Sequence, residues 1–299
     1  MNPGSPLTAD TRITQDQVRL SAGRPIRAQA WDLCPNVPPH DHDYHEICLI
    51  VAGSGTHVTK AGRSALLPGT VFVVPPAEVH AIEAVQALAL INTCYQSEWL
   101  MTDLGLVWTE PGAVPLFLST TLMRSARTDI VELRLSPGEF ALIDAELRQI
   151  EAEGDLAFPS PLFLRCAFQK AVATMARAWM RADPTSATLA FRAEVWCAMQ
   201  AIERAVSAGL SYSVAASAAG AGPTVDNFAA LFRQSTGYGP TDYFQRRRLH
   251  HACQVLLNPR PPVTQVALDL GFSDAPHFCR MFKRYKRMTP TEYRRIYQA

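Results

Sequence analysis

The sequence is short of paired cysteines and of long apolar runs. Its seven cysteines are odd in number and scattered, and none forms a Cys-x-x-Cys pair, so we expect mostly buried thiols rather than a disulfide framework. No apolar run approaches the roughly 20 residues that cross a bilayer, and residues 1–23 lack the apolar centre of a secretory signal peptide. These absences predict a chain that works in a reducing cytoplasm and has no membrane partner.

Charge is also scarce, at 18% of residues, and it is unevenly divided. From Ala190 to the end there are 14 Lys and Arg against 7 Asp and Glu, whereas the first 189 residues hold 14 and 20. A basic part joined to an acidic part suggests that only the C-terminal part binds a polyanion. Chance segregation of solvated charges would give the same counts, so motifs have to decide between the two interpretations.

Strand signals dominate the first part of the chain. Apolar runs such as 46–51, 70–74 and 88–94 are short, and Gly and Pro turn residues separate them. Several short strands at this spacing predict a sandwich or a barrel. Residues 1–25 carry no such pattern and are interpreted as a poorly structured arm.

Helical periodicity begins at residue 136. Ser136-Pro137-Gly138-Glu139 has the N-cap, the first-turn proline and the glutamate of a capping box. A second helix is predicted over 161–180, and residues 183–186 are the candidate linker. Because helices continue to the end, the order of strands followed by helices predicts a multidomain chain, all-β and then all-α.

The strongest pattern lies in residues 263–285. A short apolar-faced helix is followed by Gly271, which suits a tight turn between helices. Ser273 is the expected N-cap of a second helix, in which apolar residues from Phe278 to Tyr285 recur at i, i+3, i+4 and i+7. The opposite face of this second helix is basic. This combination is the helix-turn-helix arrangement, although a helical bundle with a solvated basic face is the simpler alternative.

The same segment resembles the second helix-turn-helix signature of the AraC/XylS family of transcription regulators. The matching residues are Ala267, Gly271, Phe272, Phe278, Arg280, Phe282, Lys283, Pro290, Tyr293 and Arg294. The sequence departs from the family at Lys286-Arg287, where an apolar residue and glycine are usual. The resemblance implies a recognition helix on double-stranded operator DNA. Arg280 is expected to reach guanine, and Lys283 and Arg284 to contact phosphates. Ala275 and His277 complete the predicted interface.

The resemblance also implies a first helix-turn-helix upstream, and residues 227–243 look like a degenerate copy. Ala230 stands where family members often place arginine on the groove-facing side, so we do not expect guanine readout here. Asn227 could still read adenine, and Arg233 could hold phosphate. Arg246-Arg247-Arg248 follows, for which a structural role and DNA contact remain open.

A second resemblance lies in the strand-rich part. The run from His40 to Glu46 followed by Gly53 resembles the first cupin motif, and Gly69 to His80 resembles the second. This resemblance covers residues 35–95 and implies a small double-stranded β-barrel. Cupin effector domains fused to AraC-type DNA-binding domains are a familiar arrangement, so the two resemblances support each other.

Alternation along a strand would point His40, His42, Tyr44 and Glu46 into this barrel. With His80 from a neighbouring strand, His40, His42 and Glu46 form a possible ligand set for a divalent transition metal. The second motif departs from metal-binding cupins at Ala77 and Ala84. The same residues, with Tyr44 and Trp31 added, could instead bind a small effector such as a sugar. His45 and His57 fall outside this pattern and are predicted to be surface residues.

Residues 92–100 resemble the barrel exit of sugar-operon regulators of the family, such as those for rhamnose, which favours a sugar effector. Trp99 and Trp108 are as consistent with a role in the hydrophobic core as with a role in effector binding. The expected domains are an arm (1–25), a cupin-like effector domain (26–135), a helical linker and dimerisation region (136–183) and a double helix-turn-helix domain (190–299).

The leading hypothesis is therefore a homodimeric transcriptional activator that binds operator DNA, responds to a small effector and acts with RNA polymerase. A metal-responsive regulator is an alternative of the same fold. A metal-dependent cupin enzyme is the third hypothesis, and the basic recognition helix argues against it.

Overall fold

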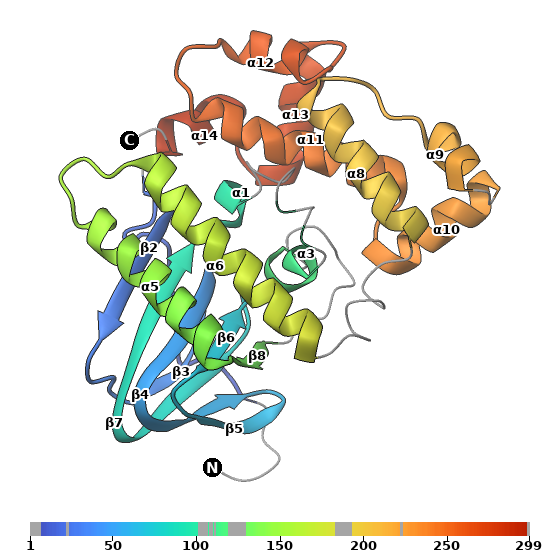
Figure 1. The fold of residues 1–299 in the computed structure, drawn as a ribbon. Coiled ribbons are helices and arrows are strands. Elements are labelled where there is room, and N and C mark those ends of the chain that lie inside the picture. The colour runs from blue at the N-terminus through green and yellow to red at the C-terminus, as the bar shows by residue number, and fades with distance from the viewer. Residues whose placement is uncertain are drawn as a thin grey trace. The chain divides into compact units, whose positions relative to one another are not determined.

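The computed structural model describes residues 7–21, 24–100, 107, 110, 112–118, 130–182, 193–221 and 224–297. These residues form two compact units (Figure 1). The first contains all the described strands, and the second contains the helices from residue 193 onward. This division confirms the predicted fold class. The candidate linker 183–186 and Trp108 lie outside the described residues. No helix in the described part is long and apolar enough to span a bilayer.

Eight strands of the first unit form one sheet. They are β1 (Thr11–Ile13), β2 (Ile26–Trp31), β3 (Val37–His42), β4 (His45–Thr59), β5 (Gly62–Leu66), β6 (Thr70–Val74), β7 (His80–Tyr95) and β8 (Val131–Arg134). The strand order is β1-β3-β7-β4-β6-β8, with β2 paired to β7 and β5 paired to β4. Every pair is antiparallel except β1 with β3.

The long strands β4 and β7 pair along their whole lengths, from His45 with Tyr95 to Thr59 with His80. The register shifts at three places between Ile50 and Gly55. Gly53 lies in this irregular stretch with φ 73°, and a Cβ there would collide with the Ala87 carbonyl, so glycine is required. The irregular stretch also interrupts the alternation of inward and outward residues.

The N-terminal segment is not a structureless arm. Thr11 pairs with His40 and Ile13 with His42, and the Gln15 N–H donates to the Asp43 carboxylate at 2.8 Å. The prediction of a poorly structured arm is therefore wrong for this stretch. A three-residue strand is too short to show a periodic pattern. It forms because it pairs with β3, which lies far away in the sequence.

Two helices complete the strand-rich unit and lie side by side along the sheet (Figure 1). They are α5 (Pro137–Gly154) and α6 (Pro161–Ala182). The capping box of α5 is confirmed, because Ser136 accepts from the Glu139 N–H and the Glu139 side chain accepts from the Ser136 N–H. Two short helices, α1 (Ser97–Leu100) and α3 (Ala113–Phe117), precede them in the chain.

The second unit is helical. Its helices are α8 (Ala193–Ser207), α9 (Val214–Ala221), α10 (Val225–Thr236), α11 (Pro240–Leu256), α12 (Val263–Asp269), α13 (Ala275–Lys286) and α14 (Pro290–Tyr297). The pairs α9–α10 and α12–α13 form two helix-turn-helix units, and α11 joins them. The apolar residues of α12 and α13 enter one core with Leu249 and Leu256 of α11, so the second helix-turn-helix is held by the joining helix.

Candidate effector pocket and DNA-binding helices

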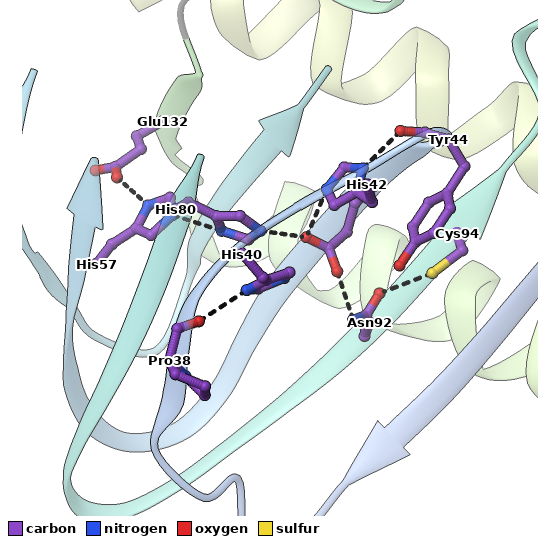
Figure 2. Close-up of polar contacts among 10 residues, drawn as sticks. Pro38, His40, His42, Tyr44, His57, His80, Asn92, Cys94 and Glu132 are labelled. Atoms are coloured by element: carbon purple, nitrogen blue, oxygen red, sulfur yellow. Dashed lines mark hydrogen bonds and ion pairs between the residues drawn. The ribbon is translucent and has the colours of Figure 1, made fainter. Parts of the chain in front are cut away.

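The first unit brings His40, Glu46 and His80 of the predicted metal set within ligand distance of one another, whereas His42 contacts Glu46 but is not part of that group (Figure 2). His40 and His42 come from β3, Glu46 from β4 and His80 from β7, and all four are buried. Ligand atoms of His40, Glu46 and His80 lie within 4.8 Å of one another. Glu46 Oε2 is 3.2 Å from His80 Nε2 and 3.6 Å from His42 Nε2.

Two imidazoles of this pocket are held from behind by backbone carbonyls. His42 Nδ1 lies 2.7 Å from the Tyr44 carbonyl, and His40 Nδ1 lies 3.0 Å from the Pro38 carbonyl. Because a carbonyl only accepts, Nδ1 donates in both, and in the neutral form of each imidazole Nε2 has the lone pair. His42 Nε2, His80 Nε2 and Glu46 Oε2 are buried without a well-formed hydrogen bond to any described residue. Such convergent acceptors suit a cation.

The electrostatics of the pocket favour the ionised form of Glu46. Burial by itself would raise the pKa of Glu46, but the adjacent His42 and His80 imidazoles hold this pKa well below its usual value. Burial lowers the pKa of His80 to about 4, against the opposing effect of Glu46. A metal ion would require an ionised Glu46 beside neutral imidazoles, so its binding would release any proton that an imidazole shares with Glu46.

Three further side chains contact the pocket that sequence analysis did not select. Asn92 Nδ2 donates to Glu46 Oε1 at 2.6 Å. His57 Nε2 lies 3.1 Å from His80 Nδ1, and His57 Nδ1 lies 2.5 Å from Glu132 Oε1. Asn92 reaches Glu46 because it pairs with Cys48, two residues from Glu46 on β4, a register that the sequence does not display. Glu132 had no sequence signal either, because β8 joins the sheet from more than 30 residues beyond β7.

The prediction that His45 and His57 are surface residues is wrong, since both are buried. Counting alternation from Glu46 places His57 on the other side of the strand. The irregular stretch between Ile50 and Gly55 resets that count and turns His57 inward. His45 does face away from Glu46, but Tyr95 covers it at 5.1 Å between ring centroids, and burial followed by His42 lowers its pKa to about 3.

The two aromatic residues predicted for the effector have different surroundings. The Tyr44 ring is buried and stacks on His42 at 4.4 Å between centroids. Trp31 is half-buried and packs against the apolar cluster around Phe72 and Leu90. Its indole Nε1 is buried and has no acceptor among the described residues.

In the second unit, the turn between α12 and α13 depends on Gly271. Its φ is 74°, and a Cβ there would come within 2.6 Å of the Gly209 carbonyl. The N-cap of α13 is Asp274, which accepts from the His277 N–H at 2.6 Å. The prediction of Ser273 as the cap is therefore off by one residue: Ser273 precedes the cap, and its hydroxyl donates to Asp274 Oδ2 at 3.3 Å.

α13 has two faces. Phe278 and Phe282 are fully buried, whereas Arg280, Lys283 and Arg284 are exposed. Ala275 and His277 are half-buried in its first turn. Its C-cap, Arg287, adopts φ 62°, so the residue that replaces the usual glycine still takes the left-handed conformation, at a cost of about 1–2 kcal/mol.

α10 presents a different surface. Thr224 caps it, Phe228 and Phe232 are buried, and Asn227, Ala230 and Arg233 are exposed. Arg233 and the first turn of α11 line a hollow of about 600 Å³ that also includes Gly239 and Pro240. The outer face of α10 is therefore less basic than that of α13.

Arg247 and Arg248 have structural roles in the helical unit. Arg247 is buried and forms a two-point ion pair with Glu203 of α8, one contact measuring 3.0 Å. Arg248 donates from Nε to the Leu270 carbonyl at 2.9 Å and lies over the Phe272 ring at 3.7 Å. Arg247 therefore joins α11 to α8, and Arg248 supports the turn of the second helix-turn-helix.

The helical unit should lose stability as the pH falls below about 6.5. His250 is buried between Arg247 and the Tyr285 hydroxyl, and burial followed by the Arg247 charge holds its pKa well below the usual value. The unfolded chain therefore binds this proton more readily than the folded one. Stability is complete above about pH 6.5 and falls by up to about 1.4 kcal/mol per pH unit below it, down to the folded-state pKa.

Hydrogen exchange of α11 amides in the full chain, corrected for intrinsic exchange rates, measures this slope between pH 7.5 and 5. His250→Gln should flatten it, whereas His251→Gln, on the half-buried neighbour, should leave it unchanged. Equal slopes in all three proteins would show that His250 does not govern the pH response.

Two known protein families match this chain, one in each unit. The profile of the AraC-like ligand binding domain matches residues 26–150, and that of a helix-turn-helix domain matches residues 216–296. The chain is 23% identical over 289 residues to the HTH-type transcriptional activator RhaR of Mannheimia succiniciproducens, covering 96% of this chain and 98% of that protein. It is 25% identical over 272 residues to the activator RhaS of Escherichia coli, covering 86% and 87%.

Among solved structures, ToxT from Vibrio cholerae matches 92% of this chain and 99% of its own at 8% identity, with a TM-score of 0.39, which is too low to bear on the argument. The two domain matches together cover more than half of the chain, in the order in which the structure places the strand-rich and helical units. The chain therefore belongs to the AraC family of transcriptional regulators, and it combines a ligand-binding domain with a helix-turn-helix DNA-binding domain.

Proposed function

We propose that this regulator reads operator DNA chiefly through α13. The observation that carries the proposal is the division of α13 into a buried aromatic face and an exposed basic face. Arg280, in the middle of the exposed face, has the fork of donors that pairs with guanine O6 and N7. Lys283 and Arg284 lie toward the C-terminal end and suit phosphates. Ala275 and His277 occupy the N-terminal turn, the end that meets base edges in this motif.

We assign α10 a smaller share of base recognition. Asn227 can pair with adenine, and Ala230 offers only a methyl group, which suits the methyl of thymine. Arg233, beside the N-terminal turn of α11, is placed to hold a phosphate near a helix N-terminus. The operator half contacted by α10 should therefore be rich in A·T pairs.

The occupant of the histidine pocket is proposed to control this DNA binding. A divalent transition metal is the first candidate, because the buried atoms His42 Nε2, His80 Nε2 and Glu46 Oε2 converge without a well-formed hydrogen bond to any described residue. His40, Glu46 and His80 would hold the ion, with His42, whose Nε2 lies 3.6 Å from Glu46 Oε2, as the fourth proposed ligand. The ion would supply a positive charge joining β3, β4 and β7. A sugar is the second candidate, favoured by the buried unpaired Trp31 Nε1, which suits a hydroxyl acceptor.

The remaining assignments concern assembly. We infer a homodimer whose seam uses α5 and α6, since Leu156 and Phe158 in their connection and Leu162 in the first turn of α6 are exposed, Phe158 at 94%. Contact with RNA polymerase is inferred from the regulators RhaR and RhaS, which are named transcriptional activators. Sedimentation equilibrium of the full chain tests the dimer.

Effector control is tested on an operator selected from random duplex DNA with the full chain. Tag-free protein is analysed for bound metal, and its operator affinity is measured with zinc, with a chelator and with a panel of monosaccharides. We expect about one zinc ion per chain, lost in His42→Ala, and a 5- to 150-fold zinc-dependent change in operator affinity. His251→Gln is the control for loss of a histidine outside the pocket.

A protein that binds no zinc but changes its operator affinity with one sugar would replace the metal by the second candidate. If neither zinc nor any sugar alters the affinity, control through this pocket is wrong.

A further inference from the structure

We propose that His57 and Glu132 are positioning residues that hold His80 in the tautomer able to bind a metal ion. The inference rests on the proposed metal role of the pocket and extends it to side chains outside the ligand set. The observation behind it is a row of hydrogen bonds, Glu132–His57–His80, that runs from β8 through β4 to β7 (Figure 2).

The row is buried and closely spaced. The His57 side chain is fully buried, with Nδ1 2.5 Å from Glu132 Oε1 and Nε2 3.1 Å from His80 Nδ1. The Ser64 hydroxyl donates to the same Glu132 oxygen at 2.7 Å. The His57 ring also stacks on Phe72 at 4.0 Å between centroids, so packing fixes its orientation.

The direction of each hydrogen bond follows from Glu132. An ionised carboxylate only accepts, so His57 must donate to it from Nδ1. A neutral His57 then has a lone pair on Nε2, which can only accept, and His80 must donate to it from Nδ1. His80 Nε2 is left with a lone pair directed at Glu46, 3.2 Å away. A carboxylate thus sets the tautomer of a ligand that it does not touch.

His40 and His42 receive the same orientation from backbone carbonyls. His80 differs because its acceptor is a side chain that ends on β8. Only Leu135 separates β8 from Ser136, the N-cap of α5. The positioning row therefore also links the pocket to the segment that leads into α5.

The opposite arrangement is chemically possible. His57 would donate from Nε2 to His80, and His80 would donate from Nε2 to Glu46. That arrangement puts a proton where the ion would lie, and it needs an additional proton on His57 or on Glu132 to satisfy their short contact. The two arrangements differ in which nitrogen of His80 carries hydrogen, which is measurable.

The test combines Glu132→Gln with a matched control. Glutamine keeps the size of the side chain but can turn its amide donor toward His57 Nδ1, which permits the reversed row. Glu83→Gln makes the same chemical change in an exposed ion pair with Arg63. Ser64→Ala removes the second donor to Glu132 and keeps the carboxylate.

The first readout is the tautomer of His80 and His57, from long-range ¹H–¹⁵N correlations of the full chain without metal. The proposal expects Nδ1–H on both residues. An Nε2–H signal for His80 overturns it, whether or not the protein binds metal. This readout uses the unsubstituted protein and does not depend on how well any variant folds.

The second readout is zinc affinity, by competition with a chromophoric chelator. We expect Glu132→Gln to bind zinc 10- to 100-fold more weakly, with Glu83→Gln unchanged and Ser64→Ala changed less than Glu132→Gln. Equal affinity in Glu132→Gln and the unsubstituted protein would overturn the positioning role. A protein with both Nδ1–H tautomers but no zinc binding would refute the metal assignment while supporting the orientation of His80.

Discussion

Glu203→Ala should destabilise the helical unit by about 3–5 kcal/mol and weaken operator binding. Glu203 and Arg247 form a buried ion pair between α8 and α11, and Arg247 continues to His250, which contacts Tyr285 of α13. Removing the carboxylate leaves a guanidinium buried without its counter-charge, which is the costly way to break such a pair. A loss of this size is a large share of the 5–15 kcal/mol that stabilises an ordinary domain.

The measurement is urea unfolding of the full chain, followed by hydrogen exchange in α8 and α11. Asp242→Ala is the control, because it breaks the exposed pair with Arg246 on the same helix and should cost at most about 1 kcal/mol. The double variant Glu203→Leu, Arg247→Met replaces both charges by apolar groups and should recover most of the loss. A loss below about 1 kcal/mol in Glu203→Ala would show that the pair does not hold the unit together.

Arg280→Ala should weaken binding to the selected operator by about 1–3 kcal/mol, or roughly 5- to 150-fold, and abolish discrimination at one G·C pair. Arg280 is exposed on α13 while its neighbours Phe278 and Phe282 are buried, so its truncation should leave the fold intact. The readout is affinity for the operator and for operators substituted one base pair at a time.

Two controls separate readout from charge. Lys283→Ala should weaken binding to every sequence alike and reduce the salt dependence by about one unit of slope. Arg148→Ala removes one exposed arginine from α5 and should leave DNA binding unchanged. If Arg280→Ala behaves like Lys283→Ala, then Arg280 contacts phosphate and another residue reads the bases.

Local patterns in the sequence were enough to predict the features that adjacent residues determine. The capping box at Ser136 and the turn at Gly271 depend on four or five consecutive residues, and the structure contains both. The two-faced α13 follows from helical spacing alone. For the same reason, the convergence of His40, His42 and Glu46 could be expected from alternation on β3 and the start of β4, close to one another in the chain.

The remaining features depend on contacts that the sequence does not display. His57 is separated from Glu46 by the irregular stretch of β4, so alternation assigns it to the wrong side. Glu132 reaches the pocket only because β8 pairs with β6. Strand β1 forms only because it pairs with β3. The sequence left open whether Arg247 and Arg248 have a structural role or contact DNA. Their partners Glu203 and Leu270 lie 44 and 22 residues away in the chain, so no local pattern shows them.

The claim that this chain recognises a DNA sequence is tested by the ratio of two of its affinities for DNA. The full chain is titrated, at physiological salt, against its selected operator and against random-sequence duplex of the same length. A specific regulator should bind the operator at least about 10³-fold more tightly. A ratio near one, with equal salt dependence on both duplexes, would mean that the basic face of α13 attracts phosphates without reading bases, and the claim would be wrong.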